Sequence, residues 1–252
     1  MAMRHLVETA QLGKRGLLVE IIGEDPEIAD VAHDSRQVIA GALFCCVGGE
    51  NYDGHEFAQQ AVNSGASVLL VERALTVDVP QIVVRDVRKS MGLLAAALRK
   101  FPSTRMHVVG VTGTNGKTTT AHLLAEIIRT YGWKTEVIGT LTGTRTTPES
   151  TDLQRMLGEW EHDGVEAVVM EVTSHALELH RVMGMTFEAA VFTNLSQDHL
   201  DFHHTMEKYF AAKAKLFTKE YSTCGIVNRD DVHGQLLLDT MAIDSTSFGM
   251  SD

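Results

Sequence analysis

The sequence predicts an α/β fold, in which a small N-terminal α/β domain precedes a P-loop α/β domain with a mainly parallel sheet. Short apolar runs alternate with helical patterns along the 252 residues, as in strands joined by crossover helices. The later runs are nearly continuous apolar sequence, which is typical of strands covered on both faces. The glycine-containing turn GTNGKTT at 113–119 joins one such run to a helical pattern, where phosphate-binding loops usually occur.

The first domain is expected at residues 1–103. Its strands are predicted from the runs ALFCCV, ASVLLVE and PQIVVRD, and its helices from HEFAQQAVNSG and SMGLLAAALRKF. Pro102 and Ser103 follow the last helix and mark the expected boundary. Cys45, Cys46 and Cys224 show no metal-ligand spacing. The adjacent pair is therefore interpreted as small buried apolar residues.

The second domain is expected at residues 104–252. It begins with the strand and turn VVGVTGTNGKTT, and a helix is predicted to start at about Lys117. Later strands are predicted at EAVVMEVT (166–173), FEAAVFTNL (187–195) and CGIVNRDD (224–231). Helical patterns separate these strands, so the sheet should be mainly parallel.

The turn at 113–119 departs from the common G-x-x-x-x-G-K-[ST] spelling, because Val111 stands where the first glycine would be. The physical requirements are still met. Gly113 and Gly116 allow backbone angles that other residues avoid. Free N–H groups at the helix start suit a polyphosphate, with Lys117 near its terminal phosphates and the Thr118 hydroxyl on Mg²⁺. The alternative is an ordinary strand-to-helix turn that contains glycine.

Polar residues end each later strand, and ligands of open parallel sheets bind beyond the carboxyl ends of the strands. These residues are Glu171, Thr173, Thr193, Asn194, Asn228 and Asp230. If these strand ends converge on the phosphate loop, they form one crevice. The alternative is that the strands simply end in polar loops, as many strands do without forming a site. Glu171 follows the apolar AVVM, where a carboxylate needs a partner such as Mg²⁺ or a bridging water.

A helix is predicted at 206–217, MEKYFAAKAKLF, and it contains an unusual lysine. Its apolar stripe passes through Met206, Tyr209, Phe210, Leu216 and Phe217. At 100° per residue Lys213 lies in the middle of that stripe, whereas Lys208 and Lys215 point away. An inward lysine must snorkel to water, find a partner or be modified.

Composition narrows the classes of function. The formal net charge is −11 and Lys and Arg do not cluster, so we expect no nucleic-acid partner. The N-terminal residues lack the apolar core of a signal peptide, and no apolar stretch is long enough for a membrane span. We therefore expect a cytoplasmic protein without a membrane partner, and a monomer.

Several motifs in order resemble the Mur ligase family, in particular the members that add the third residue of the peptidoglycan stem peptide. They are GTNGKTT (113–119), TTPE (146–149), EVTSHALELHR (171–181), FTNLSQDHLDFH (192–203) and AAKAKLF (211–217). HDSRQVIAGALFCCVGGENYDGHEF (33–57) is similar to the UDP-binding domain of those enzymes. The resemblance covers almost the whole chain, and it explains the short phosphate loop, which is the family's form.

The resemblance implies roles for individual residues. The ATP phosphates would be bound by Gly113, Thr114, Asn115, Gly116, Lys117, Thr118 and Thr119. Mg²⁺ would be held by Thr118, Glu171, His199 and a CO₂-derived carbamate on Lys213. Catalysis would depend on Lys117, Lys213 and His199, and contacts to UDP-MurNAc-L-Ala-D-Glu on Ser35, Thr146, Thr147, Thr173 and Arg181. Without the resemblance, the residues assigned here to substrate contacts would be interpreted as ordinary turn, strand-end and surface residues.

The implied reaction is ATP-dependent amide formation between UDP-MurNAc-L-Ala-D-Glu and a diamino acid, through an acyl phosphate. Thr173 stands where the family often has Ser, which keeps the hydroxyl. The segment between Lys134 and Thr146 is shorter than in many relatives, and the chain stops at Asp252. We therefore expect a truncated central domain and no C-terminal amino-acid-binding domain. The alternatives are a non-catalytic fragment that binds UDP-sugar and ATP, or another ligase of the Mur or folylpolyglutamate type.

Overall fold

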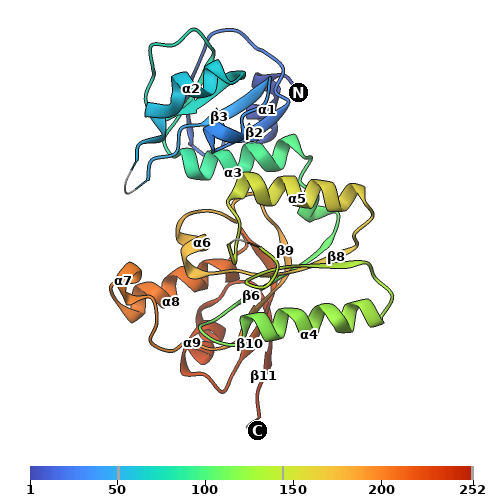
Figure 1. Ribbon diagram of the computed structural model, residues 1–252. Coiled ribbons are helices and arrows are strands. Elements are labelled where there is room, and N and C mark those ends of the chain that lie inside the picture. Colours follow the sequence, from blue (N-terminus) through green and yellow to red (C-terminus); the bar gives the residue numbers. More distant parts are fainter. Residues whose placement is uncertain (50–51, 144, 251–252) are drawn as a thin grey trace. The chain divides into compact units, whose positions relative to one another are not determined.

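The computed structural model describes residues 1–49, 52–143 and 145–250, and within them the chain forms two compact units. Unit 1 comprises Met1–Phe101 and Ser150–Arg155, and unit 2 comprises Pro102–Glu149 and Met156–Asp252 (Figure 1). Glu50 and Asn51, inside the 33–57 stretch, lie outside the described residues. The assignment of substrates to the two expected domains stays a prediction.

Unit 1 is built on a mixed sheet with the strand order β1-β5-β4-β3-β2. Its strands are β1 Leu18–Ile22, β2 Asp30–Ala32, β3 Ala42–Cys45, β4 Ala66–Val71 and β5 Gln81–Val84. Its helices are α1 Met3–Thr9, α2 Ala58–Asn63 and α3 Val87–Leu98, with 3-10 turns at Ser35–Gln37 and Gly54–Phe57. β1 runs antiparallel to β5, and the other neighbours are parallel.

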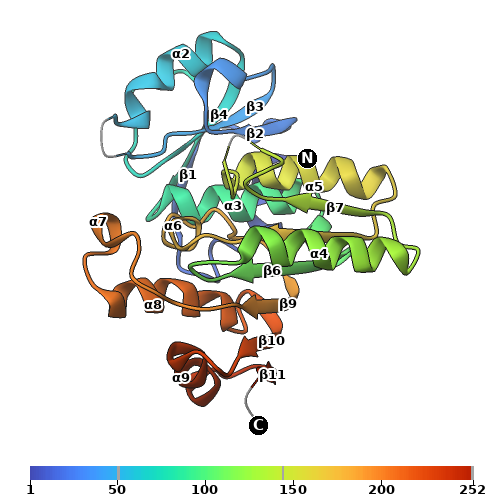
Figure 2. The ribbon, with the colours of Figure 1, turned by 60° about the horizontal axis from the view of Figure 1, so that its bottom comes forward.

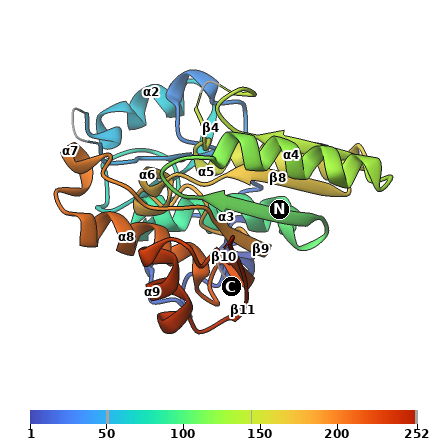
Figure 3. The same ribbon diagram turned by 90° about the horizontal axis from the view of Figure 1, so that it is seen from below.

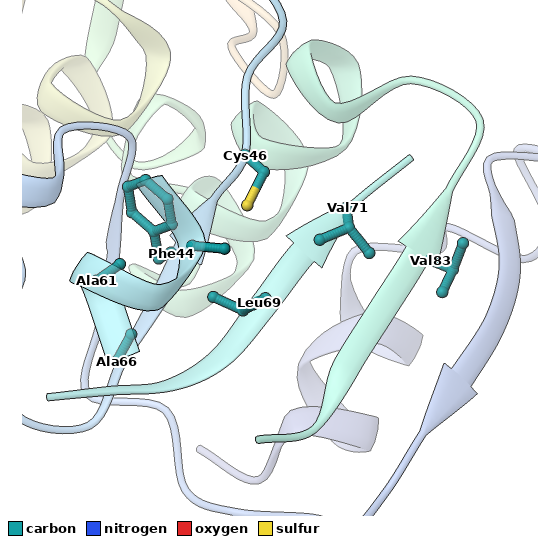
Figure 4. Close-up of a cluster of buried hydrophobic side chains, with 8 residues drawn as sticks. Phe44, Cys46, Ala61, Ala66, Leu69, Val71 and Val83 are labelled. Carbon is teal, nitrogen blue, oxygen red and sulfur yellow. The ribbon is translucent and has the colours of Figure 1, made fainter. Parts of the chain in front are cut away.

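One core cluster of unit 1 lies between α2 and the sheet. Phe44, Ala61 and Leu69 pack together there with Val71 and Val83 (Figure 4). β3 is buried along its whole length, and Cys45 and Cys46 are fully buried. Burial raises the pKa of the Cys46 thiol to about 12. The interpretation of these cysteines as small apolar residues is confirmed.

Unit 2 contains a sheet with the strand order β11-β10-β9-β6-β8-β7. Within the described residues, each of these neighbouring strand pairs is parallel. Its strands are β6 His107–Thr112, β7 Thr135–Ile138, β8 Ala167–Glu171, β9 Phe187–Phe192, β10 Ser222–Asn228 and β11 Asp244–Phe248. Its helices are α4 Lys117–Thr130, α6 Ser174–Glu178, α7 Leu200–His203, α8 Met206–Ala214 and α9 Val232–Thr240. A further helix, α5 Ser150–His162, belongs to unit 2 only from Met156 onward. The predicted mainly parallel α/β fold is confirmed.

The order in which strands are added to this sheet switches from one side of β6 to the other. After β6 the chain builds β7 and β8 on one side, and then β9 to β11 on the other. Figures 2 and 3 show α4 running alongside β6 and β8, and α9 beside β10. Ligands of open α/β sheets bind beyond the strand ends at such a switch point. Here the carboxyl ends of β6, β8 and β9 meet there.

α4 packs on the sheet through small residues at helical spacing. Ala121 and Ala125, one turn apart, lie against Val111, Val169 and Val191 of the three central strands. Alanine side chains let the helix approach the sheet closely, so the start of α4 is fixed next to the end of β6. This packing positions the phosphate loop between the strand and the helix.

Two predicted helices differ in detail from the structure. The helix expected at 206–217 ends as an α-helix at Ala214 and continues as a 3-10 turn, Lys215–Phe217. The helix expected at 55–65 begins as the 3-10 turn Gly54–Phe57. Tighter 3-10 turns are common at helix ends, and sequence periodicity does not distinguish them.

None of the helices in the described part of the chain combines the length and the apolar character that a membrane span requires.

Candidate functional site

A cleft of about 640 Å³ lies in unit 2 at the carboxyl ends of the central strands. It is lined by the phosphate loop and by polar residues of the strand ends. The lining residues are Thr114, Asn115, Gly116, Lys117, Thr118, Thr140, Arg145, Thr146, Thr147, Glu171, Thr173, His175, Arg181 and His199. The structure therefore brings together most of the site residues predicted for this domain.

The phosphate loop requires glycine at its first position. Gly113 has a φ of +148°, and a Cβ atom there would meet the Thr193 hydroxyl oxygen and the backbone of Asn194. Gly116 has a φ of +84° and caps α4, which begins at Lys117 as predicted. Both positions need backbone angles that L side chains rarely adopt.

The end of β9 holds the loop in place. The Thr114 N–H donates to the Asn194 carbonyl at 2.8 Å, and the Asn115 N–H to the Asn194 side chain at 3.0 Å. The Thr193 hydroxyl and the Asn194 amide in turn donate to the Asn115 carbonyl at 2.7 and 3.0 Å. The polar end of β9, predicted as part of the crevice, thus supports the loop directly. Thr119 follows at the start of α4 and is exposed.

Lys117 lies folded against the loop. Its Nζ donates to the carbonyl oxygens of Gly113 and Thr114, both at 2.9 Å. Burial lowers the pKa of Lys117, and the negative charge of Glu171 partly opposes that shift. The ammonium is therefore held by backbone dipoles close to the place where phosphates would bind.

Glu171 is a buried carboxylate at the end of β8, with 1% of its surface exposed. The Thr118 hydroxyl donates to its Oε2 at 3.0 Å, and the Thr140 N–H donates to its Oε1 at 2.9 Å. Gly139 leaves the space for this carboxylate, because a Cβ there would meet Oε1. The sequence predicted a metal or water partner for Glu171, and the structure shows neutral donors around it.

Lys213 has 1% of its surface exposed, as the helical phase predicted. Its Nζ donates to the Gly113 carbonyl at 2.8 Å and lies 4.7 Å from the centre of the Tyr209 ring. Burial and the nearby Lys117 charge lower the pKa of Lys213 to about 7. Lys208 is exposed, and Lys215 instead forms an ion pair with Glu178 at 2.8 Å.

His199 borders the cleft from the segment before α7. Its backbone is left-handed, with a φ of +52°, and its side chain is 45% exposed. The His199 ring lies edge-on to His175 at 4.8 Å, and His175 stacks on Phe202 at 4.1 Å. Burial, and then the neighbouring His199, lower the pKa of His175.

Thr146, Thr147, Thr173 and Arg181 lie together on one side of the cleft. The Thr147 hydroxyl donates to the Glu171 carbonyl at 2.9 Å, and the Thr173 hydroxyl caps α6 by accepting from Ala176 at 3.1 Å. The Thr146 and Thr140 hydroxyls are 3.1 Å apart. Their contacts to a substrate stay predictions.

Arg181 is half-buried rather than a fully exposed surface cation. Its side chain is 15% exposed, and its Nε lies 3.0 Å from the Glu149 carboxylate. Arg181 Nη1 also donates to the Thr147 carbonyl at 3.3 Å. Arg145 pairs with the same Glu149 carboxylate. A guanidinium is thus held at the border of the cleft.

Ser35 belongs to unit 1 and is half-buried at the start of the 3-10 turn Ser35–Gln37. Asp34 caps that turn and binds the Arg36 side chain, which lowers the pKa of Asp34 to about 2. The role of Ser35 toward a UDP group stays a prediction.

The residues suit a hard cation, although no group of three or more His, Cys, Asp or Glu side chains poised for a metal exists among the described residues. Mg²⁺ prefers one or two carboxylates together with phosphate and water oxygens. The Thr118 hydroxyl and the Glu171 carboxylate, 3.0 Å apart beside the phosphate loop, provide that kind of donor set.

Several residues of the site were not predicted from the sequence. Gly139 and Thr140 follow β7, a strand of four residues that was not predicted. The same rule of polar residues at strand ends would have found them once that strand was assigned. Tyr209, which binds the Thr114 hydroxyl at 3.2 Å, was predicted only as an apolar stripe residue.

Comparison with known proteins agrees with this geometry. A model of the Mur ligase middle domain matches residues 111–252, which is more than half of the chain. A model described as the Mur ligase family catalytic domain matches residues 27–109.

Similar proteins carry related names. The UDP-N-acetylmuramoyl-L-alanyl-D-glutamate–2,6-diaminopimelate ligase of Geobacillus kaustophilus (strain HTA426) is 44% identical over 91% of this chain and 50% of its own length. The ligase of the same name from Aquifex aeolicus (strain VF5) is 46% identical over 84% of this chain and 46% of its own length. The chain therefore spans about half the length of the curated relatives it matches.

A solved structure of a UDP-N-acetylmuramoyl-L-alanyl-D-glutamate–2,6-diaminopimelate ligase superimposes with a TM-score of 0.80 at 30% identity. The match covers 93% of this chain and 51% of that one.

Proposed function

The chain belongs to the Mur ligase family, and we propose that its protein adds the third amino acid to UDP-MurNAc-L-Ala-D-Glu in an ATP-dependent reaction. The observation that carries this proposal is the cleft itself. A phosphate loop and the buried Glu171 carboxylate line it at the switch point of a parallel sheet, and the buried Lys213 amine donates to the Gly113 carbonyl of that loop. The names of the relatives support the proposed class of substrate, and the residues of the cleft support the proposed phosphate chemistry.

The proposed reaction forms an amide through an acyl phosphate. A γ-carboxylate oxygen of the substrate's D-glutamate attacks the γ-phosphorus of ATP, and ADP leaves. The amine of a diamino acid then attacks the acyl carbon, loses a proton, and phosphate leaves with the carboxylate oxygen. An enzyme accelerates such a reaction mostly by positioning the reactants and neutralising phosphate charge.

The phosphate loop would bind and orient ATP. Backbone N–H groups from Gly116 to Thr119 lie at the positive end of α4, where the helix dipole favours phosphate charge. Lys117 would exchange its bonds to the loop carbonyls for the terminal phosphates. Mg²⁺, when bound by the Thr118 hydroxyl and Glu171 and joined by His199, would neutralise charge on those phosphates.

Lys213 would act as a carbamate. An unprotonated amine reacts with CO₂ to form a carbamate and release one proton, which replaces a buried positive charge by a negative one. A pKa of about 7 leaves much of this amine unprotonated near neutral pH. The new carboxylate would attract Mg²⁺, whereas the ammonium would repel it.

The UDP-linked substrate would be held by hydroxyl and guanidinium side chains. We propose contacts of Thr146, Thr147, Thr173 and Arg181 to its peptide part and of Ser35 to its uridine diphosphate. The Arg181 guanidinium suits a carboxylate, because planar pairs of N–H donors match carboxylate oxygens. We further propose that the protein acts as a cytoplasmic monomer, without a nucleic-acid or membrane partner.

A substrate panel tests this function. The full-length protein is incubated with ATP, Mg²⁺ and meso-diaminopimelate or L-lysine, together with UDP-MurNAc-dipeptide, UDP-MurNAc-tripeptide or a folate. Phosphate release and the mass of the product are measured. We expect product only from the dipeptide, with one added diamino acid. Product from the tripeptide or the folate would assign the protein to another ligase of the family, and no product would support a non-catalytic binding protein.

A further inference from the structure

The proposed site depends on chain segments that cannot hold their shape alone. α6 comprises only Ser174–Glu178, and α7 only Leu200–His203. Helices this short are unstable in isolation, because nucleation of a helix is unfavourable. Thr173 directly precedes α6 and His199 directly precedes α7. The placement of both residues must therefore come from tertiary contacts.

A buried hydrogen bond joins the two helices. His203 Nε2 lies 2.8 Å from the Ser174 hydroxyl oxygen. Only 4% of His203 and 1% of Ser174 are exposed, so little water can reach either partner. Loss of one group would leave the other buried without its hydrogen bond, which is costly. The pair therefore fixes the end of α7 to the start of α6.

The His203 ring also contacts the helix that carries Lys213. It packs against Tyr209 of α8 with the ring centres 5.1 Å apart, and against His175 at 5.5 Å. Tyr209 in turn contacts the Thr114 hydroxyl of the phosphate loop and lies beneath the Lys213 amine.

The backbone of His203 completes the connection. Its N–H donates to the His199 carbonyl at 2.9 Å, and this bond closes α7. His203 thus links the start of α6 and α8 through its side chain and the His199 turn through its backbone.

We propose that Ser174 and His203 form a positioning pair that fixes His199 and the Tyr209–Lys213 face of α8 in the geometry required for phosphoryl transfer. Neither residue is among those that line the cleft, so the pair acts through other residues. This inference rests on the proposed function. It assigns the pair an effect on turnover rather than on substrate binding.

Steady-state kinetics of the full-length protein tests the pair. His203→Phe keeps a ring but loses the nitrogen, and Ser174→Ala removes only the hydroxyl. Each should lower kcat by roughly 10- to 100-fold, the usual effect of losing a residue that orients a site. KM for ATP and for UDP-MurNAc-dipeptide should change by less than about threefold.

Two further variants separate positioning from a general loss of stability. His203→Gln places an amide nitrogen near the position of Nε2 and should recover part of kcat. The double variant His203→Phe/Ser174→Ala should be no slower than the worse single variant, because both remove the same bond. His162→Phe, at an exposed histidine of α5, serves as the matched control and should leave kcat unchanged.

Proton–carbon NMR of the histidine and tyrosine rings in the 252-residue chain provides a readout that does not depend on activity. His203→Phe should shift or broaden the His199 and Tyr209 signals, and His162→Phe should not. Unchanged His199 and Tyr209 signals, or an unchanged kcat in an active enzyme, would overturn the proposed pair alone. A wild-type protein that ligates none of the substrates would instead refute the proposed function, and the NMR spectra would still decide whether the pair positions His199.

Discussion

The Gly113 carbonyl oxygen accepts hydrogen bonds from two ammonium groups. Lys117 Nζ lies 2.9 Å from it and Lys213 Nζ lies 2.8 Å from it. Like charges held this close inside a protein disfavour each other, and the pKa of each lysine is lowered, chiefly by burial. A polyphosphate bound next to Gly113 would supply negative charge that stabilises both lysine side chains.

Removal of Lys117 or Thr118 should weaken nucleotide binding. Lys117→Ala deletes the charge partner of the terminal phosphates, and Thr118→Ala deletes a hydroxyl that would face Mg²⁺. Each change should raise the Kd for ATP·Mg²⁺ by roughly 10- to 100-fold, the usual effect of losing a hydrogen bond to a charged group. Isothermal titration calorimetry of the 252-residue chain measures both.

Two control variants accompany this measurement. Thr130→Ala changes a threonine at the other end of α4, and Lys134→Ala changes an exposed lysine. Both should bind ATP·Mg²⁺ as the wild type does. Equal affinity of the Lys117 and Thr118 variants with these controls would show that the loop does not bind phosphates.

Individual residues differed in how far they could be predicted. The glycines, Lys117 and Glu171 follow local rules of loop geometry and strand ends, which need no knowledge of distant partners. The hydrogen-bonding partners of the Glu171 carboxylate could not be predicted, because Thr118 and Thr140 are 53 and 31 positions away along the chain. The contact between Ser174 and His203, 29 positions apart, could not be predicted for the same reason.

At the scale of elements, α8 buries Lys213, whereas Lys215 in the 3-10 turn that follows is partly exposed. Lys213 is buried on the face that also carries Tyr209 and Ala212. Lys215 starts the 3-10 turn and pairs with Glu178, with 37% of its side chain exposed. The helical phase of the sequence predicted this difference even though the α-helix ends earlier than expected.

The two lysines should respond oppositely to substitution in the full-length protein. Lys213→Ala should preserve folding and substrate binding but lower kcat by roughly 100-fold or more, because a preorganised charge at the reacting phosphate is lost. Acetate in solution should partly restore activity. Lys215→Ala removes only a partly exposed ion pair, worth about 0–1 kcal/mol, and should leave kcat unchanged. A larger effect of Lys215→Ala would contradict both the helical phasing and the role of Lys213.

Short elements were the part of the fold that sequence patterns did not show. β7, α6 and α7 comprise four, five and four residues. Such lengths give no measurable periodicity, and tertiary contacts decide their structure. The long apolar strands were predicted because burial on both faces dominates their sequence.

For the whole molecule, the sheet order of unit 2 explains why one cleft collects residues from distant parts of the sequence. β6 lies between β8 and β9, so the loops after these three strands meet at one edge. The sequence predicted a parallel sheet with convergent polar ends. It did not predict the strand order, because register and neighbours depend on long-range pairing.

We propose that this cleft belongs to a ligase that activates a carboxylate as an acyl phosphate. The most direct test of this claim uses UDP-MurNAc-L-Ala-D-Glu labelled with oxygen-18 in the γ-carboxylate of D-glutamate. The full-length protein is supplied with this substrate, ATP·Mg²⁺ and a diamino acid, and the released phosphate is examined by mass spectrometry. We predict that each phosphate carries one labelled oxygen, since that atom attacks the γ-phosphorus and leaves with it. Amide product accompanied by unlabelled phosphate would contradict the claim.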